Sequence, residues 1–277
     1  MIAPSPAPSA SSAVERSALQ LGLIGFRVRD VDAPGDFVSD PHARRRFQTF
    51  GVSLLQTDLD ARSGIFSYHG DLDLAFAGGA FGDSSSTADI TVRGSGMFGV
   101  VSGHDAGVFA RGGAAFDLSG NRGATRGLVE LPRLELGTQW MRGPLFFEVG
   151  PSAGLAVLNV ASFDEKGADA GVQPTVGGFV VVQHTASRFP SSRVRLEVLR
   201  SETDGHSATG LVTGRGRLCA VVYGPFAACA EGEVMTAVVS FAPSDGGGRF
   251  LAARETATSF GLTLAFGEIG MTAKPRR

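Results

Sequence analysis

Apolar and polar residues alternate with a period of two along most of the chain. In the stretch 65–78, one face carries apolar and aromatic side chains, at Phe66, Tyr68, Leu72, Leu74 and Phe76. The other face of the same stretch is polar, with Ser67, His69, Asp71 and Asp73. Successive side chains of a β-strand point to opposite sides, so this pattern is typical of strands. No stretch of helical length shows the 3.6-residue repeat of an amphipathic helix, and we therefore predict an all-β fold.

Clusters of Gly, Asp, Ser and Pro separate the alternating stretches and divide the chain into twelve expected strands. Most of these stretches reach the roughly 9–11 residues that a tilted membrane-spanning strand needs. Their approximate bounds are 17–30, 45–58, 64–78, 88–101, 107–118, 126–140, 145–161, 171–185, 192–201, 208–223, 225–241 and 256–267.

The connections between the expected strands alternate in length. Short ones lie near 59–63, 102–106, 141–144, 186–191 and 224, and longer, more polar ones near 31–44, 79–87, 119–125, 162–170, 202–207 and 242–255. Outer-membrane barrels have short turns on the periplasmic side and long loops outside, and an even strand number brings both termini to the periplasmic side. The longest apolar runs fall far short of the roughly 18 residues of a spanning helix. We therefore predict a closed antiparallel up-and-down transmembrane β-barrel of about 12 strands.

A soluble β-sandwich or solenoid is the alternative interpretation, because its strands also alternate. In those folds the apolar face turns inward and the polar face meets water. Two features favour the barrel: the strands are long for a soluble sandwich, and their polar face is rich in Arg and acidic residues. We expect a flexible periplasmic tether at 1–16, the barrel at 17–267 and a tail at 268–277.

The two cysteines lie in an expected hairpin that turns at Gly224-Pro225. With Gly224 at the apex, the residues that oppose each other are Cys219 and Cys229, Arg217 and Glu231, and Arg215 and Glu233. Directly opposed residues can lie about 4.5 Å apart at Cα, which a disulfide tolerates. A Cys219–Cys229 disulfide would indicate an oxidising compartment such as the periplasm. Two reduced, packed cysteines or a zinc pair are the alternatives, but no nearby Cys or His completes a zinc site, so no metal is expected.

The same hairpin, GRGRLCAVVYGPFAACAEGEV, resembles the penultimate hairpin of small outer-membrane barrels from high-GC Gram-negative bacteria. The motif covers a short part of the chain, and the general pattern of strands and loops extends the resemblance over nearly all of the rest. The resemblance implies a porin-like protein of the bacterial outer membrane. Such barrels usually end on an aromatic residue, which here would be Phe266, but eleven residues follow it. No signal peptide is visible at the start, and we expect that it has been removed.

With the polar face turned inward, the lumen is predicted to hold a network of charges. The expected cations are Arg27, Arg29, Arg93, Arg111, Arg133, Arg195, Arg215 and Arg217. The expected anions are Asp71, Asp73, Asp89, Asp117, Glu135, Glu148, Glu197, Glu231 and Glu233, with His69 beside them. A pore selective for ions of one sign would show an excess of the opposite charge. The near balance predicts ion pairs that narrow the lumen; alternatively, many of these side chains are solvated wall residues without a selective role.

Composition and motifs exclude several functional classes. A net charge of −2 without a basic stripe argues against nucleic acid as a partner. No phosphate-binding loop, dinucleotide fingerprint or metal cluster is present, so we expect no cofactor. The best candidate catalytic cluster is SETDGHS, with Glu202, Asp204, His206 and Ser207, but this is ordinary loop composition. We predict that the protein is not an enzyme.

Three functional hypotheses follow from a barrel with a charged interior. The first is a narrow, weakly selective pore for small polar solutes. The second is a non-conducting anchor in an envelope machine for secretion, adhesion or gliding motility, docked through 1–16 and 268–277. An outer-rim hydrolase is the third. The expected partners are outer-membrane lipid and, for the anchor, other envelope proteins.

Overall fold

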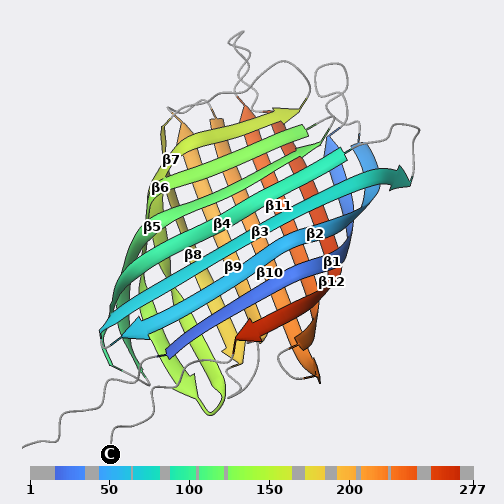
Figure 1. Ribbon diagram of the computed structural model, residues 1–277. Helices are drawn as coiled ribbons and strands as arrows, with labels where there is room; N and C mark the ends of the chain where they lie inside the picture. The colour runs from blue at the N-terminus through green and yellow to red at the C-terminus, as the bar shows by residue number, and fades with distance from the viewer. Residues whose placement is uncertain are drawn as a thin grey trace, which may run out of the picture.

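The computed structural model of the chain describes residues 16–34, 44–63, 65–81, 88–103, 106–121, 124–163, 172–184, 192–203, 207–223, 226–241 and 251–268. These residues form twelve antiparallel strands in one closed barrel, each paired with its neighbours in the sequence (Figure 1). The strands are β1 (Arg16–Pro34), β2 (Arg44–Ser63), β3 (Phe66–Phe81), β4 (Ala88–Val101), β5 (Ala106–Asn121), β6 (Ala124–Arg142), β7 (Leu145–Phe163), β8 (Gln173–His184), β9 (Ser192–Thr203), β10 (Ser207–Tyr223), β11 (Phe226–Phe241) and β12 (Leu251–Glu268).

The first and last strands close the barrel. β1 and β12 pair from Leu19 opposite Glu268 to Asp32 opposite Thr256. The prediction of a closed antiparallel barrel of twelve strands is confirmed, and each expected stretch contains most of one strand. No helix in the described part of the chain is both long and apolar enough to cross a membrane.

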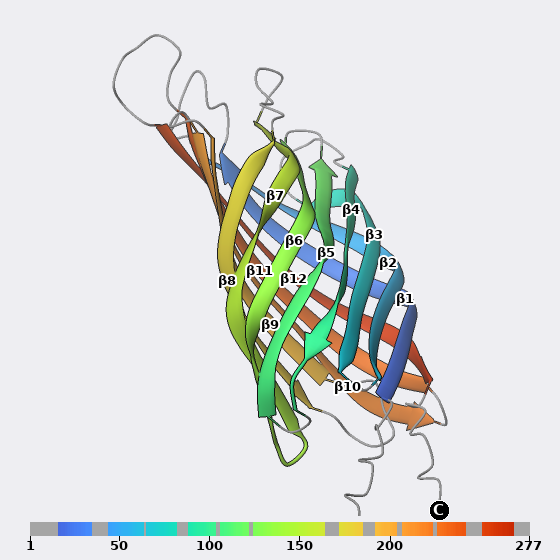
Figure 2. The same cartoon turned by 90° about the vertical axis from the view of Figure 1, so that its left-hand side faces the viewer.

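The strands run steeply oblique to the barrel axis (Figures 1 and 2). The tilt also shows in the strand register. If one starts at Leu19, near the start of β1, and steps from each residue to its partner on the next strand, one full circuit of the barrel ends beyond the level of Asp32 on β1. Such a register shift accompanies strand tilt and sets the width of a barrel. A round barrel of twelve strands about 4.8 Å apart and tilted by about 45° would measure roughly 26 Å between opposite walls.

The difference in length between the two sets of connections is smaller than the sequence predicts. β5 and β6 pair until Asn121 lies opposite Ala124, and β9 and β10 pair until Thr203 lies opposite Ser207. The expected long loops at 119–125 and 202–207 are therefore wrong, because the strand ladders continue into them. Conversely, seven residues, 185–191, separate β8 from β9 on the side where short turns were expected.

The outer face of the barrel is apolar and the inner face is mostly polar. Phe260, Leu262 and Leu264 are each more than half exposed, whereas Thr263 between them is buried. Aromatic side chains lie exposed close to the turns between β2 and β3, β4 and β5, β6 and β7, and β10 and β11, at Tyr68, Phe98, Trp140, Tyr223 and Phe226. Outward apolar surface with aromatic residues toward the strand ends is the arrangement of a barrel that spans a bilayer. The buried charged side chains, among them Arg93, Arg111 and Glu135, lie on the inner face.

Candidate functional site

Nine of the twelve strands contribute a described charged side chain to the interior, because alternate residues face inward along each strand. The described side chains of the expected network are Arg27 on β1; His69, Asp71 and Asp73 on β3; Arg93 on β4; Arg111 and Asp117 on β5; Arg133 and Glu135 on β6; Glu148 on β7; Arg195 and Glu197 on β9; Arg215 and Arg217 on β10; and Glu231 and Glu233 on β11. Arg29 and Asp89 lie within β1 and β4, but their side chains fall outside the described residues.

One group of charges, the Glu233 cluster, consists of Arg27, Asp73, Arg93, Asp117, Arg215 and Glu233. Arg27 donates to Asp73 at 3.3 Å and to Glu233 at 3.0 Å. Arg93 donates to Asp73 at 2.9 Å and forms a second ion pair with Glu233. Arg215 lies 3.0 Å from Asp117 and 3.4 Å from Glu233. The two carboxylates of Asp73 and Glu233 are thereby each shared by more than one arginine.

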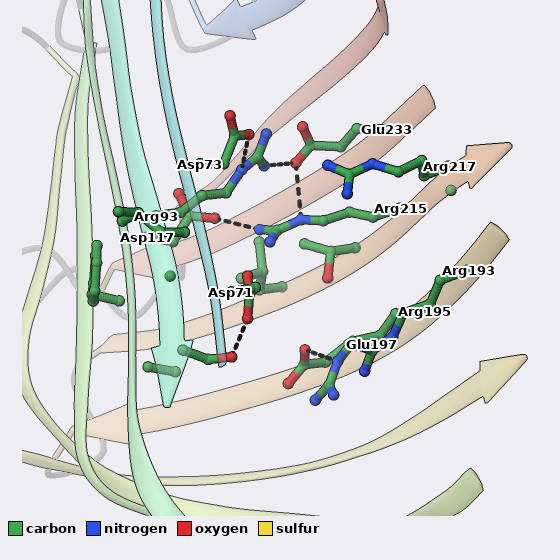
Figure 3. A pocket seen from close by; sticks show the side chains of 18 of the residues that line it. Asp71, Asp73, Arg93, Asp117, Arg193, Arg195, Glu197, Arg215, Arg217 and Glu233 are labelled. Atoms are coloured by element: carbon green, nitrogen blue, oxygen red, sulfur yellow. Dashed lines mark hydrogen bonds and ion pairs between the residues drawn. The ribbon is translucent and has the colours of Figure 1, made fainter. Parts of the chain in front are cut away.

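Two contacts of the Glu233 cluster cross the lumen, and the others join strands that are adjacent or separated by one strand. Arg93 is on β4 and Glu233 on β11, five strands apart around the barrel. Arg215 on β10 and Asp117 on β5 are also five strands apart. Figure 3 shows these side chains reaching toward one another from different walls. Each such pair places side-chain atoms inside the lumen, away from the wall.

A second group, the Glu135 cluster, lies between β5 and β9 and contains Arg111, Glu130, Arg133, Glu135, Glu148, Arg195 and Glu197. Its centre is the carboxylate of Glu135, which is 1% exposed. Glu135 accepts from Arg111 at 3.0 Å, from Arg133 at 3.0 Å and from Arg195 at 2.6 Å.

Around this centre, Arg111 binds Glu148 through two nitrogens, at 3.1 and 3.0 Å. Arg133 also pairs with Glu130 at 2.8 Å and with Glu197 on β9. Arginine keeps its proton in proteins. Pairs of this kind hold and orient charge rather than transfer protons.

A third contact crosses the full width of the barrel. Nη1 of Arg193 on β9 lies 3.0 Å from Nδ1 of His69 on β3, and these strands are six apart in the closed order. The combined length of an arginine and a histidine side chain is much smaller than the roughly 26 Å between opposite walls of a round barrel. The walls therefore approach each other here, and the barrel is flattened.

The interior is not polar throughout. Val101, Phe109, Phe179 and Val181 form a buried apolar cluster between β4, β5 and β8. The guanidinium of Arg111 lies 4.3 Å from the ring centre of Phe109, and that of Arg195 lies 4.7 Å from the ring centre of Phe179. Two guanidinium groups of the Glu135 cluster therefore lie over aromatic rings, an arrangement that stabilises a cation removed from water.

A cavity of about 210 Å³ remains inside the barrel (Figure 3). Seven arginines and eight acidic residues line it, drawn mainly from the two clusters. Carboxylates and guanidinium groups thus nearly balance around the cavity.

The described residues include no group of three or more His, Cys, Asp and Glu placed to hold a metal ion. The loop residues Asp204 and His206 of the candidate catalytic cluster lie outside the described residues, as do the side chains of Glu202 and Ser207. The absence of enzymatic activity therefore stays a prediction.

Comparisons with known proteins add little to this geometry. No family model matches the chain, and no curated protein matches it. Among solved structures, it is similar to the outer-membrane protein OmpT of Vibrio cholerae, with 9% identity over 94% of this chain and 99% of that chain and a TM-score of 0.39. The translocator domain of the autotransporter NalP from Neisseria meningitidis shares 10% identity over 90% and 88% of the two chains, with a TM-score of 0.39. The Pseudomonas putida toluene transporter TodX shares 9% over 93% and 90%, with a TM-score of 0.34. Likenesses at this level carry no functional argument.

Sequence reasoning misses two charged residues of the site. Arg193 lies two residues before Arg195 and lines the cavity, so strict alternation along β9 would have identified it. Glu130 is different, because it lies three residues before Arg133, yet both side chains are buried and paired with each other. The register of β6 shifts between Glu130 and Arg133, around Pro132. A proline inside a strand marks such a bulge, which reverses the inward and outward positions on one side of it.

The cysteine hairpin has the predicted register. Cys219 lies opposite Cys229, Arg217 opposite Glu231 and Arg215 opposite Glu233. Cys219 and Cys229 form a disulfide with Cα atoms 4.1 Å apart, so the predicted bond is confirmed. Cys229 packs inside with Ala227 and Ala265.

We expect the double substitution Cys219→Ala/Cys229→Ala to lower the free energy of unfolding by about 2–3 kcal/mol, because the bond closes a short loop and restricts the unfolded chain. Urea unfolding of the folded protein in detergent measures the change. A reducing agent should move the wild-type midpoint to that of the variant and leave the variant unmoved. Equal midpoints for oxidised wild type and variant would contradict a stabilising role.

Proposed function

We propose that the protein is a bacterial outer-membrane barrel with a narrow polar pore that its own ion pairs hold nearly closed. The observation that carries the proposal is the set of contacts between opposite walls. Arg93 reaches Glu233 and Arg215 reaches Asp117 across five strands, and Arg193 reaches His69 across six. A solute can pass only if some of these contacts separate.

The outer surface supports a location in the outer membrane. Closed barrels with an apolar belt and aromatic residues toward its edges are the architecture of bacterial outer-membrane proteins. The disulfide agrees with an oxidising compartment such as the periplasm. With both the start of β1 and the end of β12 at the same end of the barrel, that end would face the periplasm (Figure 1).

The balance of charges supports weak selectivity. A pore that selects ions of one sign carries an excess of the opposite charge on its wall. Here seven arginines face eight acidic residues around the cavity. We therefore expect the open pore to distinguish solutes by size and shape more than by the sign of their charge.

A non-conducting anchor in the cell envelope is the second candidate, and the apolar cluster in the interior favours it. Val101, Phe109, Phe179 and Val181 are each at most 4% exposed, so water has little access to this part of the lumen. An anchor needs no path for solutes, and packed side chains inside the barrel would stabilise it instead.

Single-channel recording in a planar bilayer tests the proposal and separates it from the anchor. Wild-type protein should give small, infrequent conductance steps. The double variant Arg93→Ala/Glu233→Ala removes a contact across the lumen without changing the net charge, and its steps should be severalfold larger. The matched control is Arg217→Ala/Glu231→Ala, which removes the same residue types from the neighbouring strands β10 and β11.

The control variant should raise the conductance far less than Arg93→Ala/Glu233→Ala, because its ion pair joins adjacent strands and does not cross the lumen. Large, steady conductance of the wild type would contradict a nearly closed pore. Silence of all three proteins, each shown to be folded by heat-dependent migration on a detergent gel, would contradict any pore and leave the anchor.

A further inference from the structure

Two oppositely charged side chains face each other across the cavity without touching. Asp71 comes from β3 and Arg215 from β10, and Figure 3 shows the carboxylate and the guanidinium turned toward the same space. The side chain of Asp71 is 32% exposed, more than that of any other acidic residue lining the cavity. The side chain of Arg215 is 36% exposed, more than its neighbours Arg195 and Arg217. Both groups therefore remain open to a bound molecule.

The wall formed by β9 and β10 is strongly cationic. Arg195 lies directly opposite Arg215, and Arg193 lies directly opposite Arg217. Like charges in directly opposed positions are unfavourable unless other groups compensate them. Carboxylates compensate the charges of Arg195 and Arg215: Arg195 binds Glu135 and Glu197, and Arg215 binds Asp117.

The ion pairs of Arg195 and Arg215 use two of the three nitrogens of each guanidinium group. Arg215 binds through Nη2 and approaches Glu233 through Nε, and Arg195 binds through Nη2 and Nε. Within the described part of the chain, Nη1 of both arginines has no hydrogen-bond acceptor. Because Arg195 and Arg215 occupy directly opposed positions on β9 and β10 and both line the cavity, their guanidinium groups can donate to one carboxylate there.

The opposite wall offers the carboxylate of Asp71, which makes no direct ion pair with an arginine of the described residues. Asp71 accepts a hydrogen bond from the hydroxyl of Ser95 and lies 3.7 Å from Nε2 of His69. Among the described residues, no arginine nitrogen lies within 4.0 Å of it. Asp71 can therefore accept hydrogen bonds from an ammonium group in the cavity.

We infer that the cavity binds a small zwitterion, a molecule with one carboxylate and one ammonium group. The carboxylate binds Arg215 and Arg195 on one wall, and the ammonium group binds Asp71 on the other. The volume of about 210 Å³ suits a molecule of amino-acid size. The inference rests on the proposed function for the route by which the molecule enters, and it names the class of solute that the pore would hold.

Isothermal titration of the folded protein in detergent tests the inference with three probes. γ-Aminobutyrate carries both charges, butyrate carries only the carboxylate, and butylammonium carries only the cation. A charge-assisted hydrogen bond at the second end should make γ-aminobutyrate bind at least roughly tenfold tighter than either single-ended probe. This comparison uses the wild-type protein alone, so it does not depend on any variant folding.

Variants then assign the two ends. Asp71→Asn should lower the affinity for γ-aminobutyrate to that for butyrate. Arg215→Gln should lower it toward that for butylammonium, because only Arg195 then binds the carboxylate. The matched control is Arg142→Gln, an exposed position at the end of β6 that is not part of the cavity wall, and it should bind like the wild type.

Two results would overturn the inference. Equal binding of butyrate and γ-aminobutyrate, unaffected by Asp71→Asn, would show a site for anions only. Absence of binding of all three probes to folded wild-type protein would show that there is no such site. Equilibrium binding and conductance are measured separately, so a silent barrel that binds the zwitterion refutes only the pore, and a conducting barrel that does not bind it refutes only the site.

Discussion

Glu135→Gln should destabilise the barrel by about 3–5 kcal/mol, because it leaves buried cations without their shared partner. The carboxylate of Glu135 is 1% exposed and contacts Arg111, Arg133 and Arg195 within 3.0 Å. Glutamine has nearly the same shape, so the change tests charge and not packing. Unfolding in urea, followed by the fluorescence of the single tryptophan Trp140, measures the loss.

The control for this prediction is Glu231→Gln. Glu231 pairs with Arg217 at 2.9 Å, and its side chain is 15% exposed. Water reaches this pair more easily, so we expect a loss of about 1 kcal/mol or less. If both variants lost the same free energy of unfolding, water would have to compensate the three arginines around Glu135, and the prediction from their burial would be contradicted.

Leu196→Arg should destabilise the protein by about 2–4 kcal/mol in phospholipid vesicles, because a charge on the lipid-facing side near the middle of a strand must be removed from water. Leu196 lies mid-strand on β9 and is 55% exposed. On the surface of a soluble protein, the same substitution of an exposed leucine would change stability by about 0.5 kcal/mol or less. The measurement, urea unfolding from vesicles, therefore distinguishes a bilayer from water as the surroundings of the outer face.

Val172→Arg provides the comparison within the same wall. Val172 is 68% exposed and directly precedes β8, so it lies at the end of the barrel rather than in its middle. The expected cost there is about 0–1 kcal/mol. Similar small costs at both positions would contradict a membrane-spanning barrel.

The sequence was sufficient for the barrel and for most inward-facing charges because both follow from a period of two. Arg195 and Glu197 both face inward because they lie two residues apart on β9, and alternate residues of a strand point to the same side. The disulfide was predictable because one tight turn determines the register of its hairpin, with Cys219 opposite Cys229. These are local properties of single strands or single turns.

Features that depend on the whole barrel were not predictable. The contact between Arg193 and His69 requires two walls six strands apart to approach each other, and alternation carries no information about barrel width. The inward position of Glu130 depends on a bulge whose exact place cannot be read from Pro132 alone. Phe109 shares the inward face of β5 with Arg111, and Phe179 shares that of β8 with Thr175 and Gln183, so the prediction of a polar inner face does not hold for these two rings.

The pairing of β1 with β12 means that the two charged clusters need very different lengths of chain before they can form. The Glu135 cluster uses strands β5 to β9, so it can be completed within a contiguous part of the chain. The Glu233 cluster needs Arg27 from β1 together with Glu233 from β11, which are 206 residues apart. Contacts between distant parts of a chain form slowly, because the ends must first be brought together. Until the barrel closes, both edge strands expose unpaired backbone groups to other chains. The late step of assembly is therefore also the step at which the nascent protein most needs protection from aggregation.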